Sequence, residues 1–553
     1  MFIVIDQINA ADRPIMTQDA AQRERPTGAV WSFTKYDRLG RVVLTGEVGN
    51  TSSRAVLQGI IDAQSLPIGT AALYEVADTG GFMGYSAQSL PDHTVPSAQV
   101  LTVNYYDSYS FLSLPAIAAK TQISYFGLPS GASTESLAVS GLSTGSLVRI
   151  LGTGDFLLSQ QVYDDKGRIS KTVSEHHLNG VDVITNSYNF AGELLSTNRQ
   201  HYKGGSLALT TTTQQEYDHA GRVSRTVEQI DQQPPLHVDY TYNALGQLEH
   251  KKIGNQSITY AYNSRGWLSR MSSTLFGTHL MYDDGWTRPQ AQYNGNIAEQ
   301  TWFTGDTKTA YRYSYSYDPA NRLISGTGSD GHGEIMQYDK MGNITSLVRT
   351  GGSLLPGATG SFMYDYGTQG NRLQSVSNGG TYNRNYQYNG QGSMVSDGHI
   401  KVSYNEAGLP NEITDMADIQ KVSYIYDALG NKLTKVGAVE TRHYIGGIEY
   451  TGGSAAAIDL IHTGEGIARK VGSVYHREYF LKDHLDNTRV VYDDGGEVLQ
   501  RTDYLPFGME INRKLTSPKV NYTYNGKELQ DELGQYDYSF FNLFLWALMS
   551  SPD

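Results

Sequence analysis

The sequence predicts an all-β protein built from β-hairpins that are stacked along the chain. Three observations carry this prediction: a short motif recurs many times, tyrosines alternate with other residues before each copy, and helix signals are sparse. The motif is Tyr-(Asp/Asn)-x-x-Gly, followed one position on by an apolar residue in most copies. Successive tyrosines from Tyr217 to Tyr282 are spaced 25, 20 and 20 residues apart. A period near twenty indicates one small unit that must stack on its neighbours to bury its apolar face.

Each residue type in the motif suits a hairpin turn. Asp or Asn at the second position can accept hydrogen bonds from the backbone two residues on. Gly three residues later supplies the positive φ that a bulged hairpin turn requires. The residues expected to form this signature are Tyr36, Asp37, Gly40, Tyr163, Asp164, Gly167, Tyr217, Asp218, Gly221, Tyr242, Gly246, Tyr262, Gly266, Tyr338, Asp339, Gly342, Tyr426, Asp427 and Gly430. Further copies begin at Tyr188, Tyr317, Tyr388 and Tyr404, and Asn321 takes the Gly position in the copy at Tyr317.

The strands are predicted on both sides of each turn. Before the turn the tyrosines alternate, as in Tyr240-Thr-Tyr242 and Tyr260-Ala-Tyr262, which places them on one face of a strand. After the turn, an apolar residue and then polar and β-branched residues are typical of the return strand. Tyrosine rings can pack in ladders while their hydroxyl groups stay hydrated or bonded. We therefore interpret the tyrosine stripe as structural.

Composition and charge exclude several classes of protein. The chain has 553 residues, with 40 Tyr, 59 Gly and only 16 Pro, which fits a large β array better than a compact enzyme. The net charge of −13 and the absence of a Lys/Arg cluster argue against nucleic acid and anionic membranes as partners. No apolar run approaches the ~20 residues of a membrane span. With no cysteine, disulfides and thiolate metal sites are excluded, and no cofactor or metal is predicted.

The chain divides into four predicted regions. Residues 1–157 form a divergent N-terminal β region, and residues 158–440 hold the dense repeat array. Residues 441–539 change in character, and residues 540–553 form an apolar tail. The N-terminus has too short an apolar stretch and no basic region, so it does not read as a signal peptide.

Several long motifs carry a resemblance to a known family. The array resembles the YD repeats of the Rhs/YD-repeat superfamily, and residues 475–538 resemble its Rhs repeat-associated core. The matching segments are DHLDNTRVVYDDGG (Asp483–Gly496), DYLPFGM (Asp503–Met509) and YNGKELQDELGQYDY (Tyr524–Tyr538). These segments, together with RPIMTQDAAQR and VRILGTGDFLLSQQVYDDKGR in the N-terminal third, are most similar to sequences of the Bacteroidetes branch.

The resemblance implies a fold and a function. Related proteins wind their hairpins into a spiral, hollow β-shell that encloses a C-terminal toxin. In many members the core segment also cuts the chain, so that the toxin lies loose inside. The implied role is thus structural rather than enzymatic, in a polymorphic toxin system used in bacterial competition. The implied partner is the toxin cargo, and the implied location is secreted or at the cell surface.

The sequence departs from the family pattern where the self-cleavage motif is expected. Tyr536-Asp537-Tyr538 is present, but SFFNLFLWALMSSPD then replaces the family's usual segment. Asp537 and Asp553 are the weak candidates for a degenerate pair of cleavage aspartates, of the kind that can share a proton. We expect no self-cleavage and no toxin, and we interpret the chain as truncated at both ends. We also expect that removing the apolar tail 540–553 improves solubility.

Other short motifs have simpler explanations. Gly141-Leu-Ser143-Thr-Gly145 matches a nucleophile elbow, but its flanks are β-like. Gly326-Thr-Gly328-Ser-Asp-Gly331 matches a dinucleotide motif, but no apolar helix follows. The pair His176-His177 is expected to be solvated rather than to bind zinc. The steps Asp164-Asp165, Asp283-Asp284 and Asp493-Asp494 are expected to be turn residues, with weak calcium binding as the alternative.

Two functions of different classes remain open. The first is the encapsulating shell of a toxin. The second is a cell-surface repeat protein whose tyrosine-rich β face binds glycans or a partner protein. An enzyme acting on an external substrate is a distant third.

Overall fold

The computed structural model describes residues 5–538 apart from positions 10, 26–27, 64–72, 93, 96–97, 128–138, 284–290, 306–308, 352–358, 369, 381, 454 and 517. Among these residues the chain forms two long antiparallel sheets, one of 25 strands and one of 14. Strands adjacent in sequence pair with one another almost throughout, so each sheet is a continuous meander. The predicted all-β hairpin array is confirmed.

The first sheet runs from β1 to β26 without β5. Its strands are β1 (Ile5–Ile8), β2 (Pro14–Gln18), β3 (Val30–Tyr36), β4 (Val42–Gly49), β6 (Ala98–Tyr106), β7 (Ser143–Arg149), β8 (Phe156–Tyr163), β9 (Ile169–His176), β10 (Gly180–Tyr188), β11 (Leu194–Lys203), β12 (Ser206–Tyr217), β13 (Val223–Ile230), β14 (Leu236–Tyr242), β15 (Leu248–Ile253), β16 (Gln256–Tyr262), β17 (Leu268–Ser272), β18 (Phe276–Met281), β19 (Glu299–Thr304), β20 (Ala310–Tyr317), β21 (Leu323–Gly328), β22 (Gly333–Tyr338), β23 (Ile344–Thr350), β24 (Gly360–Asp365), β25 (Ser375–Ser377) and β26 (Asn383–Asn385). Strand β5 (Ala77–Phe82) lies outside it.

The second sheet runs from β27 to β40. Its strands are β27 (Gln387–Tyr388), β28 (Met394–Ser396), β29 (Ile400–Tyr404), β30 (Pro410–Asp415), β31 (Gln420–Tyr426), β32 (Lys432–Gly437), β33 (Thr441–Ile445), β34 (Ile448–Thr451), β35 (Ala457–Thr463), β36 (Gly466–Val471), β37 (Val474–Lys482), β38 (Thr488–Asp493), β39 (Val498–Tyr504) and β40 (Glu510–Leu515). A small pair, β41 (Leu529–Gln530) and β42 (Gln535–Tyr536), follows.

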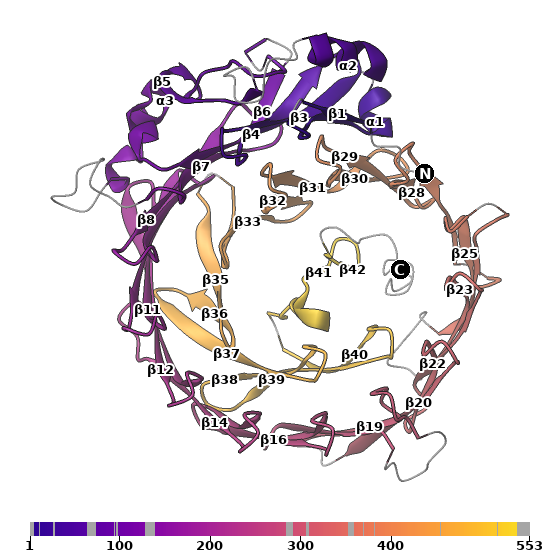
Figure 1. Ribbon diagram of the computed structural model, residues 1–553. Coiled ribbons are helices and arrows are strands. Elements are labelled where there is room, and N and C mark those ends of the chain that lie inside the picture. Colours follow the sequence, from indigo (N-terminus) through magenta and orange to yellow (C-terminus); the bar gives the residue numbers. More distant parts are fainter. Residues whose placement is uncertain are drawn as a thin grey trace.

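The two sheets wind as successive turns of one spiral. The first sheet closes a ring, which we call the wall, and the second sheet follows its inner side as the inner turn (Figure 1). Shared apolar clusters hold the two together, for example Leu209 and Ile230 of the wall with Ile448 and Tyr450 of the inner turn. A second cluster joins Trp302 of the wall to residues of β37 and β38. The molecule is therefore a hollow β-shell, as the family resemblance implies, and the second sheet lines part of the wall (Figure 1).

The repeated turn explains the motif residue by residue. In the copy at Tyr217, the carboxylate Oδ1 of Asp218 accepts hydrogen bonds from the backbone N–H groups of Ala220 (2.8 Å) and Arg222 (3.0 Å). Its Oδ2 accepts one from Arg222 Nε at 2.8 Å. Gly221 has φ +75°, and the strand register shifts at Tyr217, which is a β-bulge. The turn is thus fixed by contacts within six residues.

The other copies repeat this geometry. The motif glycines Gly40, Gly167, Gly246, Gly266, Gly342 and Gly430 have φ between 75° and 93°. The motif residues Asp37, Asp164, Asp339 and Asp427 accept the same backbone hydrogen bonds as Asp218. Where Gly is replaced, Asn321 and Asp486 take the same left-handed conformation, with φ 62° and 60°. Asn and Asp tolerate this region better than other non-glycine residues.

The motif tyrosine ties each repeat to the one before it. The Tyr242 hydroxyl donates to the carbonyl of Val223, just after the preceding turn, at 2.8 Å. The Arg222 guanidinium, which holds Asp218, also lies 4.4 Å above the Tyr242 ring. Hydroxyl groups of Tyr36, Tyr163, Tyr188, Tyr217, Tyr262 and Tyr338 donate to preceding strands in the same way.

Short helices lie on the outside of the ring beside β3 to β6 (Figure 1). They are α1 (Ala20–Arg23), α2 (Arg54–Ala63), α3 (Pro115–Ala118) and the 3-10 turns Ser110–Ser113 and Ile123–Tyr125. The ten-residue α2 was not predicted from sequence. Its local signals are Ser53, whose Oγ accepts the N–H of Val56 at 3.4 Å, and the apolar residues Leu57 and Ile61, which are four residues apart and pack on the core. No described helix is long and apolar enough to cross a membrane.

Candidate functional site: the inner segment

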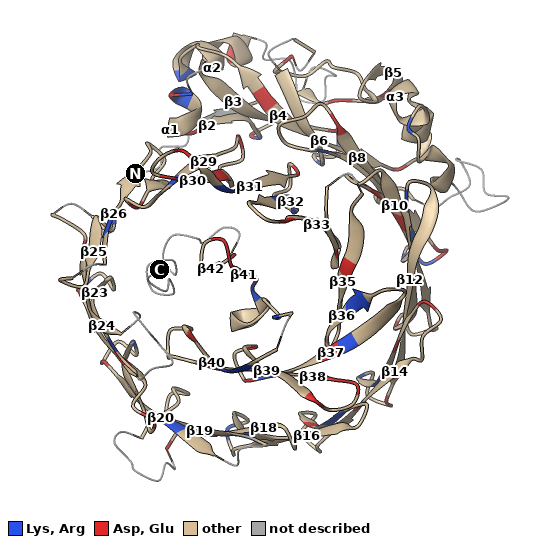
Figure 2. Ribbon diagram, turned by 180° about the vertical axis from the view of Figure 1, so that it is seen from behind, with Lys and Arg blue, Asp and Glu red and all other residues tan. Residues whose placement is uncertain are grey.

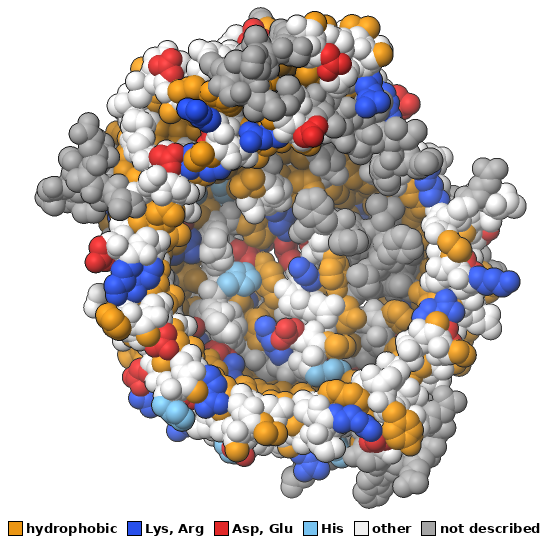
Figure 3. Space-filling view, viewed as in Figure 1, with side chains coloured by type: hydrophobic (Ala, Val, Ile, Leu, Met, Phe, Trp, Pro, Cys, Tyr) orange, Lys and Arg blue, Asp and Glu red, His pale blue; other side chains and the backbone are white. Residues whose placement is uncertain are grey.

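The chain leaves the second sheet after β40 and enters the centre of the ring. Residues 518–538, here called the inner segment, include a 3-10 turn at Tyr524–Gly526 and the pair β41 and β42 (Figure 1). A space-filling view looks into the hollow that the wall bounds, and side chains of both charges are visible inside it (Figure 3). The inner segment is thus held within the shell, and its contacts define the candidate site.

Glu528 is the principal anchor of this segment. Its carboxylate contacts Lys432 Nζ at 2.6 Å and Lys435 Nζ at 2.9 Å, both from β32. The Tyr444 hydroxyl of β33 donates to it at 2.9 Å. Burial alone would raise the pKa of Glu528, but the two lysines outweigh burial and hold this pKa at about 2. Glu528 is therefore ionised at neutral pH and acts as an electrostatic anchor.

Asp537 lies in the same cluster. Its backbone N–H donates to the carbonyl of Glu528 at 2.8 Å, and its carboxylate contacts Lys432 Nζ at 2.7 Å. Gln530 Nε2 also donates to Asp537, at 3.0 Å. Burial would lower the pKa of Lys432, but Glu528 and Asp537 raise it overall. The candidate cleavage residue is thus part of an ion-pair cluster, while Asp553 lies outside the described residues.

A second cluster holds the beginning of the inner segment. Glu449 of β34 accepts a hydrogen bond from the Tyr522 hydroxyl and contacts Arg442 and His462, each at 2.7 Å. Burial would raise the pKa of Glu449, but hydrogen bonding to His462 and the charges of His462 and Arg442 lower it. The imidazole of His462 also packs edge-on against the Tyr522 ring, with centroids 4.4 Å apart.

A third cluster fixes the inner turn to the wall. Asp503 of β39 accepts the indole N–H of Trp302 at 2.8 Å and contacts Arg513 Nε at 2.9 Å. Arg489 of β38 contacts both Asp503 and Asp483, and its side chain is 4% exposed. Its guanidinium also lies 5.0 Å from the Trp302 ring. The neighbouring strands β36 and β37 carry further basic residues, and β35 carries an acidic one (Figure 2).

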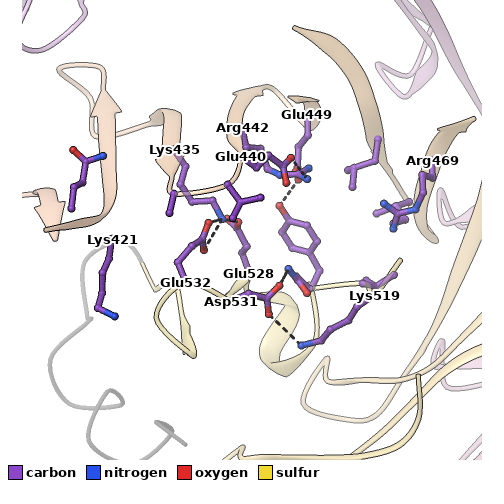
Figure 4. A pocket seen from close by; sticks show the side chains of 18 residues that line it. Lys421, Lys435, Glu440, Arg442, Glu449, Arg469, Lys519, Glu528, Asp531 and Glu532 are labelled. Carbon is purple, nitrogen blue, oxygen red and sulfur yellow. Dashed lines mark hydrogen bonds and ion pairs between the residues drawn. The ribbon is translucent and has the colours of Figure 1, made fainter. Parts of the chain in front are cut away.

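A cavity of about 530 Å³ lies between the inner segment and the second sheet. Figure 4 shows its charged lining, with Lys435, Glu528 and Glu532 on one side and Arg469 on the other. Most of these charges are paired: Lys435 with Glu528 and Glu532, and Arg469 with Glu478. The lining is therefore a nearly neutral network of anchors.

The remaining sequence motifs fall in structural positions. Ser143 is the first residue of β7, and Gly326 and Gly328 lie in β21, which a turn joins to β22. Asp164 and Asp493 accept backbone hydrogen bonds in turns, and Asp283 pairs with Arg265 at 3.0 Å. Among the described residues, no three His, Cys, Asp or Glu side chains are placed together as metal ligands.

The expectation that His176 and His177 are solvated is wrong for His176. This residue is buried at 7% exposure and bonds the carbonyl of Tyr202, while His177 contacts His443 of the inner turn. The anchors Lys432, Lys435 and Arg489 were also not identified from sequence. Lys432 and Lys435 carry no local signal of this role, because their partners lie about a hundred residues further along the chain, in the inner segment.

Comparisons with known proteins agree with this architecture. Residues 290–444 match the family described as Teneurin YD-shell. No curated protein matches the sequence significantly. The solved Photorhabdus luminescens Tc holotoxin pore with the mutation TccC3-D651A has a TM-score of 0.64 and 14% identity, over 96% of this chain and 25% of that chain.

Two further solved structures are similar. TcdB2-TccC3 has a TM-score of 0.56 and 13% identity, over 97% of this chain and 26% of that chain. TcdB2-TccC3 without its hypervariable C-terminal region has a TM-score of 0.55 and 12% identity, over 97% and 25%. The chain thus spans about a quarter of the length of the solved chains it matches. Residues 290–444 thus match the Teneurin YD-shell family, and nearly the whole chain shares the shell fold of these solved structures at 14% identity or less.

Proposed function

We propose that this chain forms the wall and inner anchor of a shell that encloses a polypeptide toxin. The observation that carries the proposal is the path of the chain: the wall closes a ring, and the inner segment is fastened inside it by Glu528, Asp537 and Tyr522. A chain continuing from such a segment would start its course inside the hollow. One of the similar solved structures is named as a Tc holotoxin pore, which supports a toxin as the cargo class.

The proposed role is structural. The Glu528 carboxylate, ionised and bound by two lysines, lacks the proton that a general acid must give. We extend this role to a polymorphic toxin system in bacterial competition, with the assembled protein outside the producing cell.

Protease protection tests enclosure. One variant carries a short protease recognition sequence in the turn at residues 531–534 between β41 and β42 of the inner segment, and a matched variant carries it in the exposed turn at Gly204-Gly205 between β11 and β12. We expect the inner site to be cut at least about tenfold more slowly in the folded protein, and both sites equally fast after denaturation. An inner site that is cut as fast as the wall site contradicts the proposal.

The glycan-binding alternative receives no support from the repeat tyrosines. The Tyr242 ring is half-buried under Arg222, and its hydroxyl is bonded to the neighbouring strand. A ring engaged in this way offers little free face to a sugar. Binding of the intact shell to a glycan array, lost on substitution of exposed aromatic residues, would revive this alternative.

A further inference from the structure

Four of the 14 histidines gather at one place on the contact between the wall and the inner turn. His176 ends β9, His177 follows it, His201 lies in β11, and His443 lies in β33 of the inner turn. The rings of His176 and His201 stack with centroids 4.8 Å apart, and those of His177 and His443 are 5.3 Å apart. We call these four residues the seam histidines.

The hydrogen bonds of His443 fit a neutral ring. Its Nε2 lies 3.1 Å from the carbonyl of Gly452, and a carbonyl can only accept, so this nitrogen donates. Its Nδ1 then faces the Thr434 hydroxyl at 3.0 Å and His177 Nε2 at 3.3 Å as an acceptor. A proton added on Nδ1 would turn this nitrogen into a donor, so it could no longer accept from the Thr434 hydroxyl or from His177.

His176 is bonded in the same way. Its Nε2 donates to the carbonyl of Tyr202 at 3.0 Å, and its Nδ1 accepts the backbone N–H of Leu178 at 3.3 Å. For His177, the second ring nitrogen Nδ1 is buried without a hydrogen-bond partner. A proton added at either Nδ1 would therefore have no acceptor within the closed contact.

The charged groups around the cluster do not compensate for added protons. Asp182 of β10 contacts His201 Nδ1 and Arg199 Nη2, each at 2.7 Å, so its charge is already shared. His201 Nε2 lies 2.7 Å from the Tyr450 hydroxyl of β34. Lys203 of β11 lies 5.0 Å from the Tyr450 ring and bonds the carbonyl of Ala456, so it adds a further positive charge.

His201 and the neighbouring residues Arg199 and Lys203 hold the two turns of the spiral together. Arg199 donates to the carbonyls of Gly446 (2.6 Å) and Ile445 (3.0 Å), which connect β33 to β34. These contacts join residues about 250 positions apart, as do His201 with Tyr450 and Lys203 with Ala456. Separation of the cluster would therefore separate the inner turn from the wall at this place.

We propose that His176, His177 and His443 form a proton-sensitive latch, which is closed while their rings are neutral and opens the contact between wall and inner turn in acid. This response belongs to the shell itself and does not depend on what the shell encloses.

The direction of the response follows from burial. Burial, together with the neighbouring His201, lowers the pKa of His176 to about 4, and burial with His443 lowers that of His177 to about 3. In an opened contact both return towards the ordinary value of about 6.5. The stability that they contribute is complete above pH 6.5 and is lost as the pH falls from 6.5 towards 4. At pH 5, protonation of either histidine shifts the equilibrium towards the open contact by about 30-fold relative to neutral pH. Protonation of both shifts it by about a thousandfold.

Hydrogen exchange of the full chain at pH 7.5 and pH 5.0, corrected for intrinsic exchange rates, tests the latch. The carboxylate of Asp182 does not titrate in this window, because its pKa is lowered to about 2 against the effect of burial by His201 and Arg199. We expect protection in β10, β11, β33 and β34 to fall at least about tenfold at pH 5.0, while β20 to β22 keep theirs.

The double variant His176→Gln/His177→Gln removes both titrating rings but keeps an amide that can donate like Nε2. We expect its seam protection to change less than about threefold between the two pH values. His219→Gln, at an exposed position in the turn after Tyr217, is the matched control and should behave as the native protein. For each protein we compare its own protection at pH 7.5 with its protection at pH 5.0. A general loss of stability in the variant therefore does not obscure the comparison. Equal ratios in the double variant and the native protein, or no fall in the native protein, would overturn the proposal.

Discussion

The wall and the inner turn are built from the same hairpins but are held by different kinds of contact. In the wall, Arg222 pairs with Asp218 four residues away, and the two side chains are 31% and 19% exposed. In the inner turn, Arg489 pairs with Asp503 and Asp483 at 4% and 3% exposure. The repeated turn pair of the wall is thus a local, partly exposed contact, while Arg489 of the inner turn forms a buried one. Loss of Arg489 should therefore matter more than loss of Arg222.

The largest expected effect is at Arg489. Arg489→Met leaves the buried carboxylates of Asp483 and Asp503 short of a partner, which costs about 3–5 kcal/mol in comparable cases. The matched wall variant Arg222→Met should cost at most about 1 kcal/mol, because exposed ion pairs contribute little. Denaturant unfolding measures both, and hydrogen exchange in β37 to β39 locates the loss. Equal losses in the two variants would mean that the wall and inner turn do not differ in this way.

The next effect is a pH dependence at Glu528. Its pKa is held at about 2 in the folded protein, below the usual value near 4.5, so its ion pairs stabilise above pH 4.5 and are lost as the pH falls towards 2. This shift corresponds to up to about 3 kcal/mol. Glu528→Gln should therefore weaken protection of residues 527–537 at pH 7, and the difference from the native protein should shrink by pH 3. Glu216→Gln, at a 63% exposed wall position, serves as the control. A difference that is constant with pH would show that Glu528 is not an ionic anchor.

A smaller effect is expected at a wall turn. Gly192 has φ +95° with open space around the position of a Cβ, so Gly192→Ala isolates backbone strain, at about 1–2 kcal/mol. Gly192→Asn should cost less, because Asn321 already occupies the same position of a sibling repeat with φ 62°. Thermal unfolding of the two variants gives the comparison. If Asn costs as much as Ala, the left-handed turn does not determine the residue at this position.

The smallest effects separate equivalent tyrosines. Tyr242 of the wall and Tyr504 of the inner turn donate to the carbonyls of Val223 (2.8 Å) and Thr488 (2.7 Å). Tyr242→Phe should cost about 0.5–1 kcal/mol, since water can reach the freed carbonyl. Tyr504→Phe should cost about 1–2 kcal/mol, because Tyr504 is 5% exposed and the carbonyl is left buried without a partner. Urea unfolding curves distinguish the two, and a larger loss for Tyr242→Phe would reverse the expected order.

Much of the local structure could be predicted, and the reason is visible in the contacts. Asp218, Gly221 and Arg222 fix their turn within a few residues, so the motif alone contains the information. The contacts of His177 could not be predicted, because its partner His443 is 266 residues away. The solvated pair expected from the local sequence was accordingly wrong for His176. The helix α2 was missed although Leu57 and Ile61, four residues apart, form an apolar face that packs on the core.

The candidate site was predicted only in part. The segments DHLDNTR and YNGKELQDELGQYDY identified the region that resembles the Rhs repeat-associated core, and they include Asp537. That Glu528 would bind Lys432 and Lys435, or that Asp503 would bind Trp302 of the wall, depended on which strands face one another.

The sequence by itself determined the hairpin, its turn, its tyrosine face and the order in which the hairpins pair. These features depend on hydrogen bonds and alternation over some twenty residues, and each repeat specifies them again. Only the tertiary structure decided where the spiral closes, which wall strands the inner turn covers and which charges meet inside. Those outcomes depend on small rotations that add up over many strands, and no single repeat encodes their sum.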